Sequence, residues 1–164
     1  MKEIHVGIIG FGTVGKGLAY ALLNQKERLA KKTGTSFIIS TIADLGETSL
    51  PKEFTGTRLT NDAADILNDP NIDIVVELIG GMEPAKRFIL QAIANGKHVV
   101  TANKALLSVH GQEIFRAAAA KNVEVGFEAS VGGGIPVIKA LKEGLVANRI
   151  LSIEGIMNGT ANYI

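Results

Sequence analysis

The strongest constraint on the fold is a glycine motif that stands between a predicted strand and a predicted helix. Residues 4–9 form a β-rich run, and Gly10, Gly12 and Gly15 follow it in the spacing G-x-G-x-x-G. The first glycine permits a tight turn, the second lets a phosphate approach the backbone, and the third lets the helix pack against the strand. The motif predicts that residues 1–44 are a βαβ unit that receives the pyrophosphate of a dinucleotide. A tight turn without a ligand is the alternative.

Strand-like and helix-like segments alternate along the rest of the chain. Apolar strands separated by helices predict a mostly parallel sheet covered on both faces, which is a doubly wound α/β fold of the Rossmann type. The predicted strands cover residues 4–9, 37–43, 72–79, 98–101, 123–127 and 149–157. The predicted helices cover residues 13–32, 63–68, 84–95, 108–121 and 136–147, and residues 44–59 are expected to form an irregular connection.

Composition narrows the classes of function. The 164 residues are 46% hydrophobic and 20% charged with a net charge of +1, so nothing in the charge favours a nucleic acid partner. The absence of cysteine excludes disulfides, cysteine-based zinc sites and thiol nucleophiles. The apolar runs are too short to span a bilayer, and no signal peptide is recognised at the N-terminus. We therefore expect a globular protein of the cytoplasm.

Asp44 follows the second predicted strand, where an acidic side chain accepts hydrogen bonds from the adenosine ribose. It lies 29 residues after Gly15, which is longer than the usual spacing of about 20. No arginine follows it to hold a 2′-phosphate, so NAD is favoured over NADP. An aspartate that only forms or caps a turn is the alternative.

Two further groups of residues are expected at the carboxyl ends of strands, where doubly wound sheets bind ligands. Gly80 and Gly81 follow the third long strand and permit a close approach of cofactor or substrate. Thr101, Asn103 and Lys104 follow the next strand. An ammonium beside a nicotinamide could bind a substrate oxygen or act as a base, whereas most lysines are simply exposed. The asparagine could orient substrate or cap the turn.

A glycine-rich turn over residues 128–135 has two interpretations. Exposed carbonyl groups together with the Glu128 carboxylate would form a site for a hard cation. The glycines could equally serve a tight connection between strand and helix. The three histidines, His5, His98 and His110, show no metal-binding spacing and are interpreted as structural or solvated.

Five segments of the chain resemble homoserine dehydrogenases. They are IGFGTVG at residues 9–15, VELIGGMEPA at 76–85, VTANKALL at 100–107, FEA with GGIP within 127–136, and GIMNGTANYI at 155–164. The resemblance covers essentially the whole chain, and the later segments are more specific than the glycine motif. It implies hydride transfer between NAD or NADP and L-homoserine or L-aspartate 4-semialdehyde, in the biosynthesis of threonine, methionine and isoleucine.

The resemblance also implies roles for individual residues. It places Lys104 at the nicotinamide and the substrate, as the catalytic candidate. The expected cofactor-binding residues are Gly10, Phe11, Gly12, Thr13, Val14, Gly15, Asp44, Gly80, Gly81, Thr101, Asn103 and Lys104. A sodium-type monovalent cation is expected at Glu128, Val131, Gly133 and Ile135. Ala43 stands where many relatives carry a basic residue before the acid, which also favours NAD.

The expected domain division is an NAD(P)-binding domain over residues 1–155 and the start of a substrate and dimerisation domain over residues 156–164. In the resembled family, the substrate-binding carboxylates and the proton-transfer lysine lie after Ile164. We therefore expect this chain to bind cofactor with little or no turnover, and the full-length enzyme to be a homo-oligomer. A nucleotide-sensing module and a dehydrogenase of the same fold with another amino or semialdehyde substrate are the alternatives.

Overall fold

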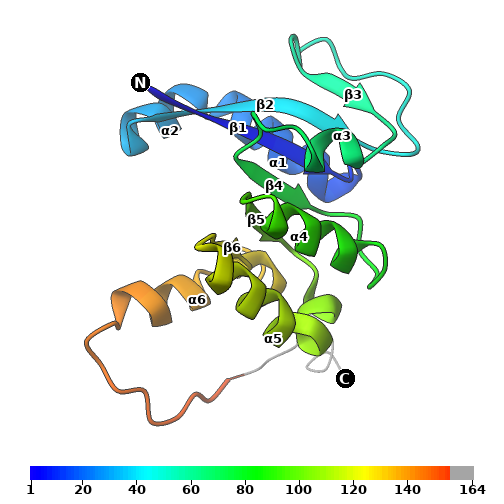
Figure 1. Ribbon diagram of the computed structural model, residues 1–164. Helices are drawn as coiled ribbons and strands as arrows, with labels where there is room; N and C mark the ends of the chain where they lie inside the picture. The colour runs from blue at the N-terminus through cyan, green and yellow to red at the C-terminus, as the bar shows by residue number, and fades with distance from the viewer. Residues whose placement is uncertain (156–164) are drawn as a thin grey trace, which may run out of the picture.

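The computed structural model describes residues 1–155 and contains a six-stranded, all-parallel sheet (Figure 1). The strand order is β3-β2-β1-β4-β5-β6, which confirms the doubly wound fold. The strands are β1 (Lys2–Ile9), β2 (Thr35–Ala43), β3 (Arg58–Thr60), β4 (Ile74–Glu77), β5 (His98–Thr101) and β6 (Val125–Gly126). The helices are α1 (Thr13–Asn24), α2 (Lys26–Thr33), α3 (Ala64–Leu67), α4 (Ala85–Ala94), α5 (Lys104–Lys121), α6 (Val137–Lys139), the 3-10 helix η1 (Glu128–Ser130) and the π-helix η2 (Ala140–Gly144).

Two hydrophobic cores cover the two faces of the sheet. Neighbouring residues of a strand point to opposite faces, and the central strand β1 shows this directly. Ile8 packs into a core with Ala19 of α1, whereas Ile9 packs into a core with Ile66 of α3 and Ile89 of α4. The sheet therefore lies between α1 on one side and α3, α4 and α5 on the other, and α1 leaves β5 uncovered on its own side, where Val100 is exposed.

The single helix predicted over residues 13–32 is wrong, because the chain forms two helices there. Gln25 leaves the helical region with φ −105° and ψ 12°, and it ends α1 and begins α2. The helix α1 buries Gly15 and Ala19, whereas α2 buries no residue. The break separates a helix that packs on the core from a charged helix that lies on the surface.

Other boundaries differ from the sequence prediction by one or two residues, and larger differences concern β3 and α5. The strand β3 lies at the end of the segment predicted to be irregular, where Arg58 pairs with Thr41 of β2 at the sheet edge. The helix α5 begins at Lys104 instead of residue 108, because the Asn103 side chain accepts a hydrogen bond from the Leu106 N–H at 3.1 Å. Asparagine is among the best residues at this capping position.

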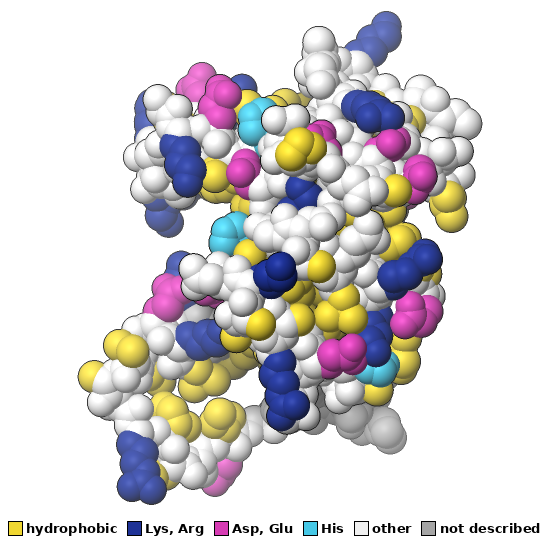
Figure 2. Space-filling model, viewed as in Figure 1, with side chains coloured by type: hydrophobic (Ala, Val, Ile, Leu, Met, Phe, Trp, Pro, Cys, Tyr) yellow, Lys and Arg dark blue, Asp and Glu magenta, His cyan; other side chains and the backbone are white. Residues whose placement is uncertain are grey.

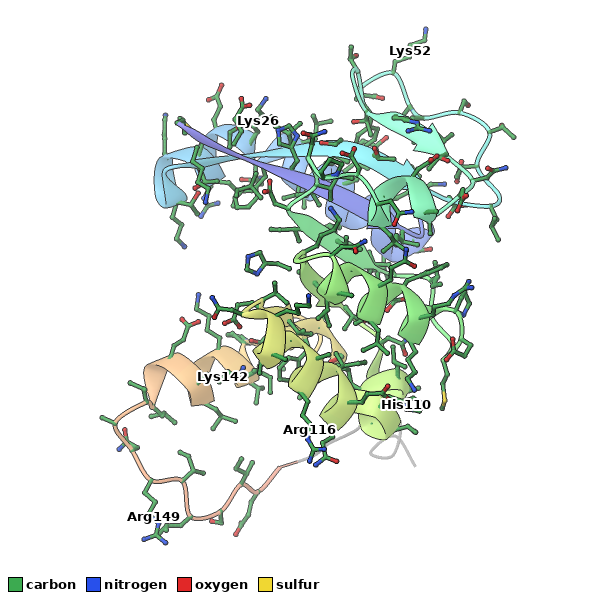
Figure 3. All side chains as sticks on the ribbon, in the orientation of Figure 1. Lys26, Lys52, His110, Arg116, Lys142 and Arg149 are labelled. Atoms are coloured by element: carbon green, nitrogen blue, oxygen red, sulfur yellow. The ribbon has the colours of Figure 1, made fainter. Side chains whose placement is uncertain are left out.

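The strand predicted over residues 149–157 is wrong for its described part. Residues 149–155 form no strand and continue from η2 as an extended arm (Figure 1). The predicted helix over residues 136–147 is reduced to α6 and η2, which end at Gly144. The arm carries exposed hydrophobic side chains (Figure 2), and its labelled Arg149 points away from the sheet (Figure 3). Residues 156–164, with the predicted start of the second domain, lie outside the described residues.

Within residues 1–155, none of the helices combines the length and the apolar character needed to cross a membrane.

Candidate functional site

The glycine turn connects β1 to α1 and leaves an open space beside Gly12. Gly10 has φ +99°, and a Cβ atom there would lie 2.8 Å from the carbonyl group of Leu78. A Cβ atom on Gly15 would overlap the carbonyl oxygen of Gly10. By contrast, no atom lies within 4 Å of the Cβ position of Gly12. Gly10 and Gly15 thus allow the turn to pack closely against the neighbouring backbone, and Gly12 leaves room for a ligand next to the backbone.

The N-terminus of α1 faces the same space. The helix has no side-chain cap at Gly12, and Lys16 donates its N–H to the Gly12 carbonyl oxygen at 2.9 Å. The N–H groups of Thr13, Val14 and Gly15 precede this first helical hydrogen bond, so they are available to an anion. The structure therefore places the six-residue motif at a helix N-terminus of the kind that suits an anion.

Asp44 lies directly after β2, and its carboxylate is hydrogen-bonded by backbone N–H groups. The Phe11 N–H donates to Oδ2 at 2.6 Å, and the Gly46 and Glu47 N–H groups donate to Oδ1 at 2.8 and 3.2 Å. Burial raises the pKa of Asp44, but these donors and the Lys16 ammonium outweigh it and hold the pKa below its ordinary value of 3.8. Asp44 is therefore a charged acceptor beside the glycine turn.

Two cavities lie along the carboxyl ends of the strands. The larger, of about 500 Å³, is lined by Ile9, Gly10, Gly12, Ala43, Asp44, Leu45, Asn61, Ala63, Leu78, Ile79, Gly80, Pro84 and Phe88. The smaller, of about 190 Å³, is lined by Val14, Glu77, Leu78, Gly80, Ala102 and Asn103. The glycine turn lies between these two cavities. We call the larger one, which Asp44 lines, the Asp44 cavity, and the smaller one, which Val14 lines, the Val14 cavity.

Sequence reasoning did not single out Glu77, which the structure places at the end of β4. Its side chain has no exposed surface, and its Oε2 accepts a hydrogen bond from the Thr101 hydroxyl at 2.7 Å. Its Oε1 accepts from the Ile79 and Gly80 N–H groups at 2.9 and 3.3 Å. A carboxylate at the end of an otherwise apolar strand was the feature that could have revealed it.

Lys104 lies at the first position of α5, directly after the Asn103 cap. Its side chain is exposed, and no hydrogen bond or ion pair joins its ammonium group to the described residues. It does not line either strand-end cavity, although its neighbour Asn103 lines the Val14 cavity. Lys104 is therefore available at the edge of the site to a group that binds there.

The turn predicted to hold a cation is organised by Glu128. Its two carboxylate oxygens accept hydrogen bonds from the Ile138 and Lys139 N–H groups at 2.8 and 2.9 Å, so this side chain caps α6. Gly133 has φ +62°, and the Ile135 carbonyl oxygen accepts a hydrogen bond from the Val137 N–H. Within residues 1–155, no three His, Cys, Asp or Glu side chains cluster as metal ligands. A cation here would be bound by backbone carbonyl groups together with the Glu128 carboxylate.

A doubly wound parallel sheet, a glycine turn at a helix N-terminus and cavities at the strand ends define a dinucleotide-binding domain. The chain belongs to the homoserine dehydrogenase family. The family described as "Homoserine dehydrogenase, NAD binding domain" matches residues 10–128, and the family described as "Homoserine dehydrogenase" matches residues 136–164.

Individual relatives agree with this assignment. The chain is 53% identical to a homoserine dehydrogenase of Pseudomonas aeruginosa, covering all of this chain and 38% of that protein. A crystal structure of a homoserine dehydrogenase from Thiobacillus denitrificans matches 91% of this chain and 35% of its own with a TM-score of 0.84 and 52% identity. A hyperthermophilic archaeal homoserine dehydrogenase in complex with NADPH matches 88% of this chain and 50% of its own with a TM-score of 0.67 and 25% identity. The chain thus spans about two fifths of the length of the curated relative.

Proposed function

We propose that this chain is the NAD(P)-binding part of an enzyme that interconverts L-homoserine and L-aspartate 4-semialdehyde. The open space at Gly12, beside the unfilled N–H groups of α1, carries the proposal, because a pyrophosphate needs that close approach to backbone. Family membership supports the substrate pair. The bound nicotinamide supplies the acceptor or donor of the hydride.

The chain's own residues bind and orient the cofactor in this proposal. Residues 10–15 hold the pyrophosphate, and Asp44 accepts hydrogen bonds from the adenosine ribose in the larger cavity. The nicotinamide half then extends towards Gly80 and Asn103, which line the Val14 cavity, and Thr101 is buried behind them. The exposed Lys104 ammonium binds the oxygen of the substrate at that end, where charge changes as the hydride leaves or arrives.

NAD is the preferred dinucleotide in our proposal. The Asp44 carboxylate is charged at neutral pH, and it would repel the 2′-phosphate of NADP where it accepts the ribose hydroxyls of NAD. Calorimetric titration of the 164-residue chain with each dinucleotide tests both points. Binding of neither would refute the cofactor role, and tighter binding of NADP would reverse the role of Asp44.

A monovalent cation of the sodium type is proposed at Glu128, Val131, Gly133 and Ile135. Carbonyl oxygens suit such a cation, and a second lone pair on a Glu128 oxygen remains for it beside the helix-capping bonds. Sodium should then raise the thermal stability of the wild-type chain more than that of Glu128→Gln. Equal shifts in both proteins would leave Glu128 with its capping role alone.

The division into a cofactor domain over residues 1–155 and the start of a substrate domain over residues 156–164 is part of the same proposal. A second family segment matches residues 136–164 and so begins before the proposed boundary, and this match and the length of the relatives support a second domain without fixing where it starts. A full-length enzyme of this kind works in the cytoplasm as a homo-oligomer, with the rest of its substrate site after Ile164. A steady-state assay with homoserine should therefore detect little or no turnover by this chain.

A further inference from the structure

The buried Glu77 carboxylate lies at the strand ends, and the proposed function does not yet use it. Its oxygens accept three hydrogen bonds, from Ile79, Gly80 and Thr101, and no salt bridge reaches it within residues 1–155. A buried carboxylate is costly unless hydrogen bonds compensate for its lost hydration. The Glu77 carboxylate therefore holds in place the three groups that donate hydrogen bonds to it.

Glu77 begins a chain of hydrogen bonds that joins two loops. The Thr101 hydroxyl donates its single proton to Glu77, so it accepts the Asn103 N–H at 3.0 Å with a lone pair. The side-chain amide of Asn103 in turn donates a hydrogen bond to the Gly81 carbonyl oxygen at 2.6 Å. The loop after β4 and the loop after β5 are thus fastened to each other through side chains that converge on one carboxylate.

Gly80 and Gly81 depend on these hydrogen bonds because they have no side chains that pack, unlike Leu78 and Ile79 before them. Gly80 and Gly81 both have φ +71°, a conformation that side chains other than glycine rarely adopt. No atom lies within 4 Å of the Cβ position of Gly80, and only the Glu83 carbonyl oxygen reaches that of Gly81, at 4.0 Å. Two successive residues in this conformation are therefore fixed by Glu77 from one side and Asn103 from the other.

This network forms part of the wall of the Val14 cavity. Glu77, Gly80 and Asn103 line it, opposite Val14 in the first turn of α1, whose side chain is 60% exposed. The Asp44 cavity lies on the other side of the glycine turn, so a dinucleotide whose adenosine half binds there places its nicotinamide half at the Val14 cavity.

We propose that Glu77 is a positioning residue for the nicotinamide half of the bound dinucleotide. It acts through the loop of residues 79–81 and through Thr101 and Asn103, and it sets the width of the cavity that receives the ring. The inference rests on the proposed function, since it requires that the chain binds NAD(P). It differs from a purely structural role because it concerns one half of the ligand and not the other.

The test compares two ligands that differ only by the nicotinamide. NADH and ADP-ribose are titrated calorimetrically into the wild-type chain, Glu77→Gln, Thr101→Val and the control Thr57→Val. Thr57 donates its hydroxyl to the Ile39 carbonyl oxygen at 2.9 Å, outside both strand-end cavities, so the control loses one hydroxyl hydrogen bond elsewhere. The fluorescence emission of bound NADH is a second measurement, which reports the surroundings of the nicotinamide ring independently of affinity.

We expect Glu77→Gln to weaken NADH binding about five- to tenfold, the size of one or two lost hydrogen bonds, and to leave ADP-ribose binding within about twofold. Thr101→Val should act in the same direction, and it decides the question if Glu77→Gln does not fold. Thr57→Val should change neither affinity. Equal losses for the two ligands, or no loss, in the folded variants would overturn the inference. A wild-type chain that binds neither ligand would overturn the proposed function and this inference together.

Discussion

The Asp44 side and the Glu77 side of the site use the same kind of group in different ways. Both carboxylates follow a parallel strand and accept backbone N–H groups from a glycine-containing loop. Asp44 is partly exposed and lines the larger cavity, whereas Glu77 is buried behind the smaller one. An acid that is open to solvent can exchange its partners for a ligand, and a buried acid holds the loop that the ligand meets. The partly exposed Asp44 carboxylate is therefore suited to binding the ligand, whereas the buried Glu77 carboxylate is suited to positioning the loop that contacts the ligand.

The largest effect should come from Gly12, which lies between the two sides. Gly12→Ala should weaken NAD binding about a hundredfold, because a methyl group would fill the space where the pyrophosphate approaches, and such overpacking costs about 1–3 kcal/mol. The free energy of unfolding should fall by only about 1 kcal/mol, since the backbone of Gly12 is extended and alanine is a poorer N-cap than glycine. Calorimetry and urea denaturation measure the two quantities.

Gly17 provides a matched control for that substitution. Its Cβ position is equally open, but it lies within α1 beyond the first turn. Gly17→Ala should retain NAD binding and raise stability by about 1 kcal/mol, the helix preference of alanine over glycine. Equal losses of affinity in the two variants would contradict the placement of the pyrophosphate.

The next effect should appear when the charge of Asp44 is removed. Asp44→Asn should weaken NAD binding about tenfold, because a charged acceptor for the ribose hydroxyls is lost, and should weaken NADP binding less. The ratio of the two affinities, measured by calorimetry, is the readout. An unchanged ratio would mean that Asp44 only supports the turn, and the difference between the two sides of the site would disappear.

Asp44 should also have a smaller effect, which appears in the pH dependence of the free energy of unfolding. The pKa of Asp44 is lowered on folding, so its contribution is complete above the unfolded value near 3.8 and is lost as pH falls through the folded value. The stability difference between the wild type and Asp44→Asn should therefore be constant near neutral pH and shrink below 3.8. Urea denaturation over this range measures it, and a difference that persists in acid would contradict the N–H bonds to the charged form.

The smallest effect should come from the surface pair beside the Asp44 cavity. Glu47 Oε1 lies 2.5 Å from Lys16 Nζ, and this hydrogen bond raises the pKa of Lys16 although solvent partly competes for it. Glu47→Gln should free the ammonium and shift the preference towards NADP by only about twofold, as exposed ion pairs are weak. The shift should vanish at high salt. A shift that salt does not alter would exclude a charge effect.

Local patterns predicted most of the fold, and long-range contacts account for what they missed. The strand His98–Thr101 was predicted with both of its boundaries, and the short helix α3 lies within the predicted residues 63–68. The strand β3 was missed because three residues carry no periodicity, and their pairing depends on β2. The helix break at Gln25 was missed because no glycine or proline marks it.

The same distinction applies to the site. The glycine turn was predicted from the spacing of its motif, and Asp44 was predicted from its place directly after the second strand of the same local unit. Glu77 could not be assigned in this way, because the hydroxyl group that donates a hydrogen bond to it belongs to Thr101, 24 residues further along the chain. Only the pairing of β4 with β5 brings these two residues together.

The central position of β1 has a consequence for how the chain acquires its fold. Val6 pairs with Ile39 of β2 on one side and with Ile74 of β4 on the other. During synthesis β1 therefore lacks its β4 neighbour until the chain has been extended through Ile74 and beyond. Folding of such a sheet is governed by the slow closure of long loops, so the apolar β1 segment is the part of the nascent chain most in need of protection from aggregation.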